Sequence, residues 1–121
     1  IKLEPDYADA YNNRGNAYGN LGLHQRAVED YNEAIRLKPD CAAAYNNRGY
    51  AYYDLGLSQR AIEDFNKAIR LKPDLAEVYI NRGAVYLMQG NNNRGCRDAQ
   101  KACALGNCTL LELAKGKGDC R

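Results

Sequence analysis

The chain has 121 residues, of which 45% are hydrophobic and 26% charged, a composition that allows one modest core and excludes wholesale disorder. Its 17 Lys and Arg residues against 15 Asp and Glu residues leave a formal net charge of +2, too balanced for a dedicated nucleic-acid-binding face. No apolar run approaches the roughly 20 residues that a membrane-spanning helix requires, so membrane insertion is not expected.

The N-terminal segment resembles two later segments of the same chain. Residues 1–6 read Ile-Lys-Leu-Glu-Pro-Asp, and closely similar stretches recur at 35–40 and 69–74. We therefore expect residues 1–7 to be the tail of a preceding repeat, and the chain to be a portion of a longer protein.

The body of the chain is an internal repeat with a period of 34 residues. Residues 8–41 and 42–75 align without gaps and are identical at 25 of 34 positions. Residues 76–108 continue the pattern as a third repeat with a degenerate second helix. Residues 109–121 remain as a cysteine-containing C-terminal cap.

Each repeat predicts two helices. Tyr11, Gly15 and Tyr18 recur at spacings of four and three, which places them on one face of an α-helix, and no stretch alternates with the period of a strand. Gly22 stands where the first helix must reverse, a usual position for glycine. The predicted helices, in chain order, are 8–21, 24–37, 42–55, 58–71, 76–89, 92–104 and 109–116.

Small and aromatic residues recur in register from repeat to repeat. The recurring columns are Tyr11/Tyr45/Tyr79, Gly15/Gly49/Gly83, Tyr18/Tyr52/Tyr86, Ala27/Ala61, Tyr31/Phe65, Ala34/Ala68/Ala102 and Pro39/Pro73. They resemble the tetratricopeptide repeat (TPR) over nearly the whole chain. The resemblance implies an all-α, right-handed α-solenoid of antiparallel helix pairs, with three TPR units, the remnant of a preceding one and a C-terminal capping helix.

A column of arginines is matched by a column of aspartates 16 residues later. The two columns lie roughly opposite each other in an antiparallel helix pair, which predicts a structural Arg–Asp pair in every repeat. A functional anion site is the alternative, disfavoured because each arginine has a partner at hand. The predicted pairs are Arg14–Asp30, Arg48–Asp64 and Arg82–Asp98.

Asparagine stands directly before each of these arginines, at Asn13, Asn47 and Asn81. In the family that the chain resembles, this column faces a concave groove, and an amide can both donate to and accept from a peptide backbone. The resemblance therefore implies an asparagine ladder for an extended peptide, and the alternative is that these amides are simply solvated. The further groove candidates are Asn12, Asn16, Asn46 and the side-chain anchors Tyr50, Tyr53 and Leu87.

One specialisation of the family, the clamp for acidic C-terminal tails, is not expected here. That clamp uses Lys, Asn, Asn, Lys and Arg. At the matching positions of this chain only the two asparagines are present, as Asn16 and Asn47. Glu77 occupies one of the basic positions and would repel a terminal carboxylate.

Four of the five cysteines lie in the degenerate third repeat and the cap. Cys96 and Cys103 are two helical turns apart, about 10.5 Å in rise, too far to bridge each other. An antiparallel cap helix would bring Cys103 to Cys108 and Cys96 to Cys120, so we predict two nested disulfides.

Two alternatives stay open for these cysteines: small buried hydrophobic residues, or a four-cysteine metal or redox module. Paired thiols would indicate an oxidising compartment, secreted or periplasmic, whereas reduced thiols would fit the cytoplasm. Cys41 has no evident partner and is expected to pack as a hydrophobic residue.

The sequence predicts no enzyme. His24, the single histidine, stands at a helix start, and no nucleophile–base pair, metal-ligand pair or phosphate-binding glycine loop is evident, so no metal or cofactor is expected. The predicted function is a protein–protein interaction scaffold that binds an extended peptide or short helix of a partner in its concave groove. The alternative is a self-assembly module that stacks repeat ends into homo-oligomers.

Overall fold

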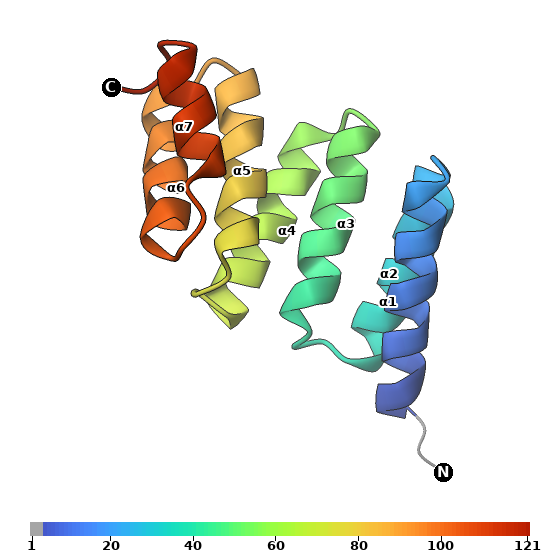
Figure 1. Ribbon diagram of the computed structural model, residues 1–121. Helices are drawn as coiled ribbons and strands as arrows, with labels where there is room; N and C mark the ends of the chain where they lie inside the picture. The colour runs from blue at the N-terminus through green and yellow to red at the C-terminus, as the bar shows by residue number, and fades with distance from the viewer. Residues whose placement is uncertain (1–3) are drawn as a thin grey trace. The chain divides into compact units, whose positions relative to one another are not determined.

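A computed structural model gives the backbone of residues 4–121 and the side chains from Tyr7 onward. This described part of the chain contains seven α-helices and no strand, which confirms the predicted all-α class (Figure 1). It divides into two compact units, Ile1–Leu71 and Lys72–Arg121. Within the described residues, no helix combines the length and apolar character needed to cross a membrane.

The first unit consists of two helix pairs (Figure 1). The helix α1 packs against α2, α3 packs against α4, and the two pairs meet through α2 with α3 and α1 with α3. The helices are α1 (Glu4–Asn20), α2 (His24–Leu37), α3 (Ala42–Asp54) and α4 (Ser58–Leu71).

The start of α1 differs from the prediction. The sequence places the first helix at 8–21 and treats Pro5 as a helix stop, but α1 already begins at Glu4. A proline in the first turn costs no hydrogen bond, because an N–H at that position has no partner within the helix. The predicted tail over residues 1–7 lies mostly outside the residues whose side chains are described.

The reversal between the two helices of a repeat has the same geometry three times. A glycine with φ near +80°, in the left-handed region that glycine adopts without steric cost, ends the first helix. The residue directly after this glycine closes the turn, because its N–H donates back to the tyrosine carbonyl of the first helix. These bonds are Leu23 N–H to Tyr18, Leu57 N–H to Tyr52 and Asn91 N–H to Tyr86, at 2.8, 2.8 and 2.9 Å.

The core of the first unit is built on close contacts between a glycine and an aromatic ring. A Cβ placed on Gly15 would lie 2.6 Å from Tyr31 Cε1, and one on Gly49 would lie 2.7 Å from Phe65 Cε1. The ring of each second helix therefore lies directly on the backbone of the first. Any larger side chain at these glycines would have to push the ring away.

The second unit consists of α5 (Ala76–Met88), α6 (Asn92–Ala104) and α7 (Thr109–Gly116). Here Ala99, fully buried, occupies the position of the aromatic residue. The space beside Gly83 is filled instead by Leu110 of α7, whose Cδ2 would lie 2.9 Å from a Cβ at that glycine. The third repeat thus draws part of its core from the cap helix.

Candidate functional site

The predicted Arg–Asp pairs are present in all three repeats. Arg48 Nε donates to Asp64 Oδ2 at 2.8 Å and Arg48 Nη2 donates to Asp64 Oδ1 at 2.7 Å, a two-pronged geometry. The carboxylate is 5% exposed. The equivalent bonds measure 2.8 and 2.8 Å for Arg14–Asp30, and 2.9 and 2.8 Å for Arg82–Asp98.

Each of these arginines also lies between two tyrosine rings of its own helix, a feature that the sequence analysis missed. The Arg48 guanidinium carbon is 5.5 Å from the Tyr45 ring centroid and 5.6 Å from that of Tyr52, within cation–π range. The signal was available, because tyrosine recurs three residues before and four residues after each arginine. The other two sets are Arg14 with Tyr11 and Tyr18, and Arg82 with Tyr79 and Tyr86.

The electrostatics of Arg48 fit a structural role. The hydrogen bond with Asp64 raises the pKa of the Arg48 guanidinium above its ordinary value, against the opposing effect of burial. Arg48 Nη1 also donates to Asn32 Oδ1 of the neighbouring repeat at 2.9 Å. The charge of Arg48 is balanced by Asp64 and its Nε, Nη1 and Nη2 each donate a hydrogen bond, which favours the predicted packing role over an anion site.

Two predicted groove asparagines from adjacent repeats contact each other. Asn47 Nδ2 on α3 donates to Asn12 Oδ1 on α1 at 3.0 Å. This bond uses one amino donor of Asn47 and one carbonyl of Asn12. The Asn12 amino group and the Asn47 carbonyl remain, and they match the carbonyl and the N–H of a peptide backbone, respectively.

The remaining asparagines of the first unit differ from one another. Asn16 Oδ1 accepts a hydrogen bond from the Tyr31 hydroxyl at 2.6 Å, and burial, together with the charge of Asp30, raises the pKa of Tyr31 to about 12. Asn13 is exposed. The structure departs from the prediction at Asn46, which is 3% exposed and therefore lies inside the unit instead of presenting its amide to a ligand.

The two tyrosines predicted as anchors form a pair on α3. Their ring centroids are 6.3 Å apart and the ring planes are tilted by 41°. Tyr50 is 52% exposed, and Tyr53 is half-buried. A large aromatic surface is therefore available on the same helix as Asn47.

Next to this pair, His24 approaches Asp54, a contact that no pattern in the sequence predicts. His24, at the start of α2, places its Nδ1 3.6 Å from Asp54 Oδ2, at the end of α3. That separation is longer than a hydrogen bond, and Nδ1 finds no hydrogen-bond partner within the described residues. The sequence interpretation of His24 as a turn residue omits this neighbour from the following repeat.

The groove candidates of the second unit, Leu87 and Asn81, are both partly buried. Leu87 packs onto Gly95, where a Cβ would lie 2.5 Å from Leu87 Cγ, so its side chain fills the core of the third repeat. Asn81 is half-buried. Leu87 takes this packing position because the small Gly95 replaces the alanine of the other repeats, and its anchoring role stays a prediction.

The four C-terminal cysteines meet as two separate pairs. The structure joins Cys96 to Cys120, with Cα atoms 5.7 Å apart, and Cys103 to Cys108. Cys41 is half-buried and has no disulfide partner in the described part of the chain. Among the described residues, no three His, Cys, Asp or Glu side chains gather in a way that could hold a metal ion.

The comparisons with known proteins match this geometry. The profile of the family described as "Tetratricopeptide repeat" matches residues 1–40 and 12–76, which together exceed half of the chain. A search of the curated proteins gives no significant match.

Solved structures give the same fold. The chain is similar to the Arabidopsis OM64 TPR domain, with 26% identity, a TM-score of 0.90 and coverage of 95% of this chain and 96% of that one. It is similar to the first TPR of Spaghetti (RPAP3) bound to HSP90 peptide SRMEEVD, with 22% identity, a TM-score of 0.88 and coverage of 96% and 94%. The second TPR of that protein, bound to the same peptide, has 26% identity, a TM-score of 0.79 and coverage of 82% and 92%. With the repeated glycine–aromatic contacts and the family profile in agreement, this chain belongs to the tetratricopeptide repeat family.

Proposed function

We propose that the chain binds an extended peptide of a partner protein across the faces of α1 and α3 that carry Asn12 and Asn47. At the coarser level, TPR proteins are in general non-catalytic interaction scaffolds, and membership of the family supports this function. The second TPR of Spaghetti, 26% identical to this chain, has a peptide bound, which supports a peptide rather than a small molecule as ligand.

The hydrogen bond between Asn47 and Asn12 is the observation that carries the proposal. It fixes two amides from neighbouring repeats, so their remaining donor and acceptor are oriented before a ligand arrives. Pre-oriented groups lose less side-chain entropy on binding. An extended backbone, which offers one donor and one acceptor per residue, is the matching ligand.

Selection from a phage-displayed random heptapeptide library would test the proposal, followed by affinity measurement on a synthetic consensus peptide. We expect Asn47→Ala to weaken binding about tenfold, the loss of roughly one hydrogen bond with its orientation. Gln59→Ala, which removes an exposed amide on the outer helix α4, serves as the matched control and should leave binding unchanged. Equal affinity of wild type and Asn47→Ala would contradict the proposal.

We further propose that the cysteine pairs Cys96–Cys120 and Cys103–Cys108 are disulfides in the mature protein. Their positions support this, because both join α6 to the cap segment that completes the third repeat. Mass spectrometry of the unreduced protein should show a mass lower by four hydrogens than that of the reduced protein. Four free thiols would contradict the pairing.

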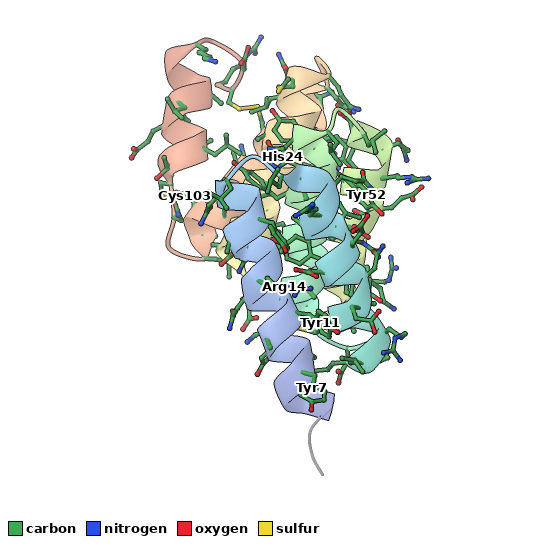
Figure 2. All side chains as sticks on the ribbon, turned by 90° about the vertical axis from the view of Figure 1, so that its right-hand side faces the viewer. Tyr7, Tyr11, Arg14, His24, Tyr52 and Cys103 are labelled. Atoms are coloured by element: carbon green, nitrogen blue, oxygen red, sulfur yellow. A yellow bond between two sulfur atoms is a disulfide. The ribbon has the colours of Figure 1, made fainter. Side chains whose placement is uncertain are left out.

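Self-association is a second candidate function, favoured by the face of α1. A cavity of about 270 Å³ is lined by Tyr7, Ala10, Tyr11 and Arg14, and the three labelled side chains follow one another along α1 (Figure 2). The Arg14 side chain is 58% exposed, whereas that of Arg48, which α2 covers, is 20% exposed. Sedimentation equilibrium tests this candidate, and a strict monomer at high protein concentration would eliminate it.

A further inference from the structure

In the first helices of the two repeats in the first unit, each cation is paired with an aspartate of the same repeat. Arg14 and Arg48 are the only Lys or Arg residues in α1 and α3, and each is bound by both carboxylate oxygens of its aspartate. The same two helices carry exposed carboxylates at Asp9 and Asp54. With each arginine balanced by its aspartate, the charge that remains on the described side chains of α1 and α3 is negative.

One carboxylate lies beside the tyrosine pair. Asp54 follows Tyr50 by four residues and Tyr53 by one, so Tyr50 and Asp54 share a face of α3 one turn apart. The side chain of Asp54 keeps 28% of its surface exposed, and its Oδ2 lies 3.6 Å from His24 Nδ1, longer than a hydrogen bond. Its oxygens are thus able to accept from a ligand.

This combination is confined to one repeat. The positions equivalent to Tyr50, Tyr53 and Asp54 hold Asn16, Gly19 and Asn20 in the first repeat, and Ala84, Leu87 and Met88 in the third. All three sets lie in the first helix of a repeat, in α1, α3 and α5, and each of these helices is formed. The packing of a repeat therefore does not require two tyrosines and a carboxylate here, and their presence calls for a different cause.

The chemistry of the three side chains fits a cation. Aromatic faces attract Lys and Arg side chains, the aliphatic stem of which also packs on the ring, and the carboxylate adds an opposite charge. We infer that Tyr50, Tyr53 and Asp54 form a pocket for a Lys or Arg side chain of the extended peptide, so that the preferred partner segment is cationic. This inference rests on the proposed function, because the Asn12–Asn47 pair holds the peptide backbone next to the pocket.

The inferred preference is opposite in sign to the ligand of a structural neighbour. The HSP90 peptide SRMEEVD, bound to the second TPR of Spaghetti, carries two glutamates and a C-terminal aspartate against a single arginine. On this chain such a peptide would meet the carboxylates of Asp9 and Asp54 without a free Lys or Arg on α1 or α3 to bind it. Because the pocket could accept the arginine of this peptide, the version in which that arginine is replaced by glutamine is the suitable negative probe.

The test uses the same random heptapeptide library on the complete chain, with the fraction of Lys and Arg in the selected peptides as the first readout. The inference expects enrichment of Lys or Arg and depletion of Asp and Glu. The consensus peptide should bind about tenfold more tightly than its Lys/Arg→Gln version, and the Arg→Gln version of SRMEEVD should bind more weakly than both. Selected peptides without cation enrichment would overturn the inference.

Variants locate the effect and separate it from the proposed function. Asp54→Asn and Tyr50→Ala should each lower the affinity for the consensus peptide while leaving that for the Gln version unchanged. Glu63→Gln, the same charge change on the exposed side of α4, should alter neither. Because these side chains are at the surface, circular dichroism is expected to show an intact fold in all three variants.

The two failures have different signatures. If both peptide versions bind equally and both are weakened by Asn47→Ala, the backbone site stands and the cationic pocket is wrong. If Asn47→Ala changes neither affinity, or if the library yields no binder, the proposed function itself fails and the inference fails with it.

Discussion

In the second repeat, Phe65 of α4 fills the space beside Gly49, whereas in the third repeat Leu110 of α7 fills the space beside Gly83. The first solution lies entirely within one helix pair. The second borrows a side chain from an additional helix, because Ala99 stands where the aromatic residue would be. Repeats with nearly the same backbone can therefore differ in whether they are self-contained.

The position of the cysteines follows from this difference. A short helix of eight residues, Thr109–Gly116, has little stability of its own, so Leu110 is held against Gly83 only if α7 is attached. Both cysteine pairs connect α6 with the segments that flank α7. The second repeat has no such pair, and its own aromatic ring makes one unnecessary.

The largest effect is expected where the core is self-contained. Phe65→Ala removes a fully buried ring and should lower the free energy of unfolding by about 3–5 kcal/mol, measured by urea denaturation followed by circular dichroism. Phe65→Tyr is the matched control, because Tyr31 occupies the same position in the first repeat. A loss for Phe65→Ala no greater than that for the control would contradict the account of the second repeat.

The two cysteine pairs should contribute different amounts to the stability of the protein. The Cys96–Cys120 pair closes a loop with a sequence separation of 24 and the Cys103–Cys108 pair one of only 5. On the chain-entropy estimate, the longer loop contributes about 3.5 kcal/mol and the shorter about 2 kcal/mol. Replacement of each pair by serines, with thermal unfolding as the readout, should therefore lower the melting temperature more for the outer pair.

If the two double variants lost the same stability, loop closure would not be the origin of the effect. If neither lost any, α7 would be held by packing alone, and the third repeat would need no covalent link to complete its core.

A smaller loss is expected for the borrowed side chain itself. Leu110 is only half-buried, so Leu110→Ala should lower the free energy of unfolding by about 2 kcal/mol, the lower end of the range for such truncations. If Leu110 replaces the missing aromatic residue, Ala99→Phe should overpack the wild-type core but recover stability in the Leu110→Ala background. A double-mutant cycle in urea measures this coupling, and additive effects would show that the two residues do not share a space.

Much of this fold could be predicted from the sequence because the repeat is local. The turn glycines and helix starts depend on residues within one repeat, and the predicted starts of the six later helices coincide with those observed. The start of α1 was missed because Pro5 is compatible with either a helix end or a first turn. The contact between Leu110 and Gly83 was also out of reach, since it depends on how the cap helix packs and not on any periodic pattern.

The candidate site could be predicted in part, for the same physical reason. The Arg–Asp pairs follow from facing columns of one hairpin, whereas the bond between Asn47 and Asn12 joins different columns of neighbouring repeats. The approach of His24 to Asp54 is likewise a contact between repeats. A single repeat pattern describes which residues recur, but the surface at a junction depends on residues that do not recur.

The smallest effect at neutral pH concerns the ring that the first repeat uses in place of Phe65. Tyr31→Phe removes the hydrogen bond to Asn16 and should lower the free energy of unfolding by about 1 kcal/mol at pH 7. Because the pKa of Tyr31 is raised from near 10 to about 12, the wild-type protein keeps the stabilisation below pH 10 and loses it as the pH rises towards 12. Urea denaturation at intervals over this range should therefore show a shallower decline for Tyr31→Phe than for wild type, with Tyr50→Phe, a change at an exposed ring, as the control that keeps the wild-type slope. Parallel declines would mean that burial of this hydroxyl does not distinguish the first repeat from the second, in which case the two self-contained cores are equivalent.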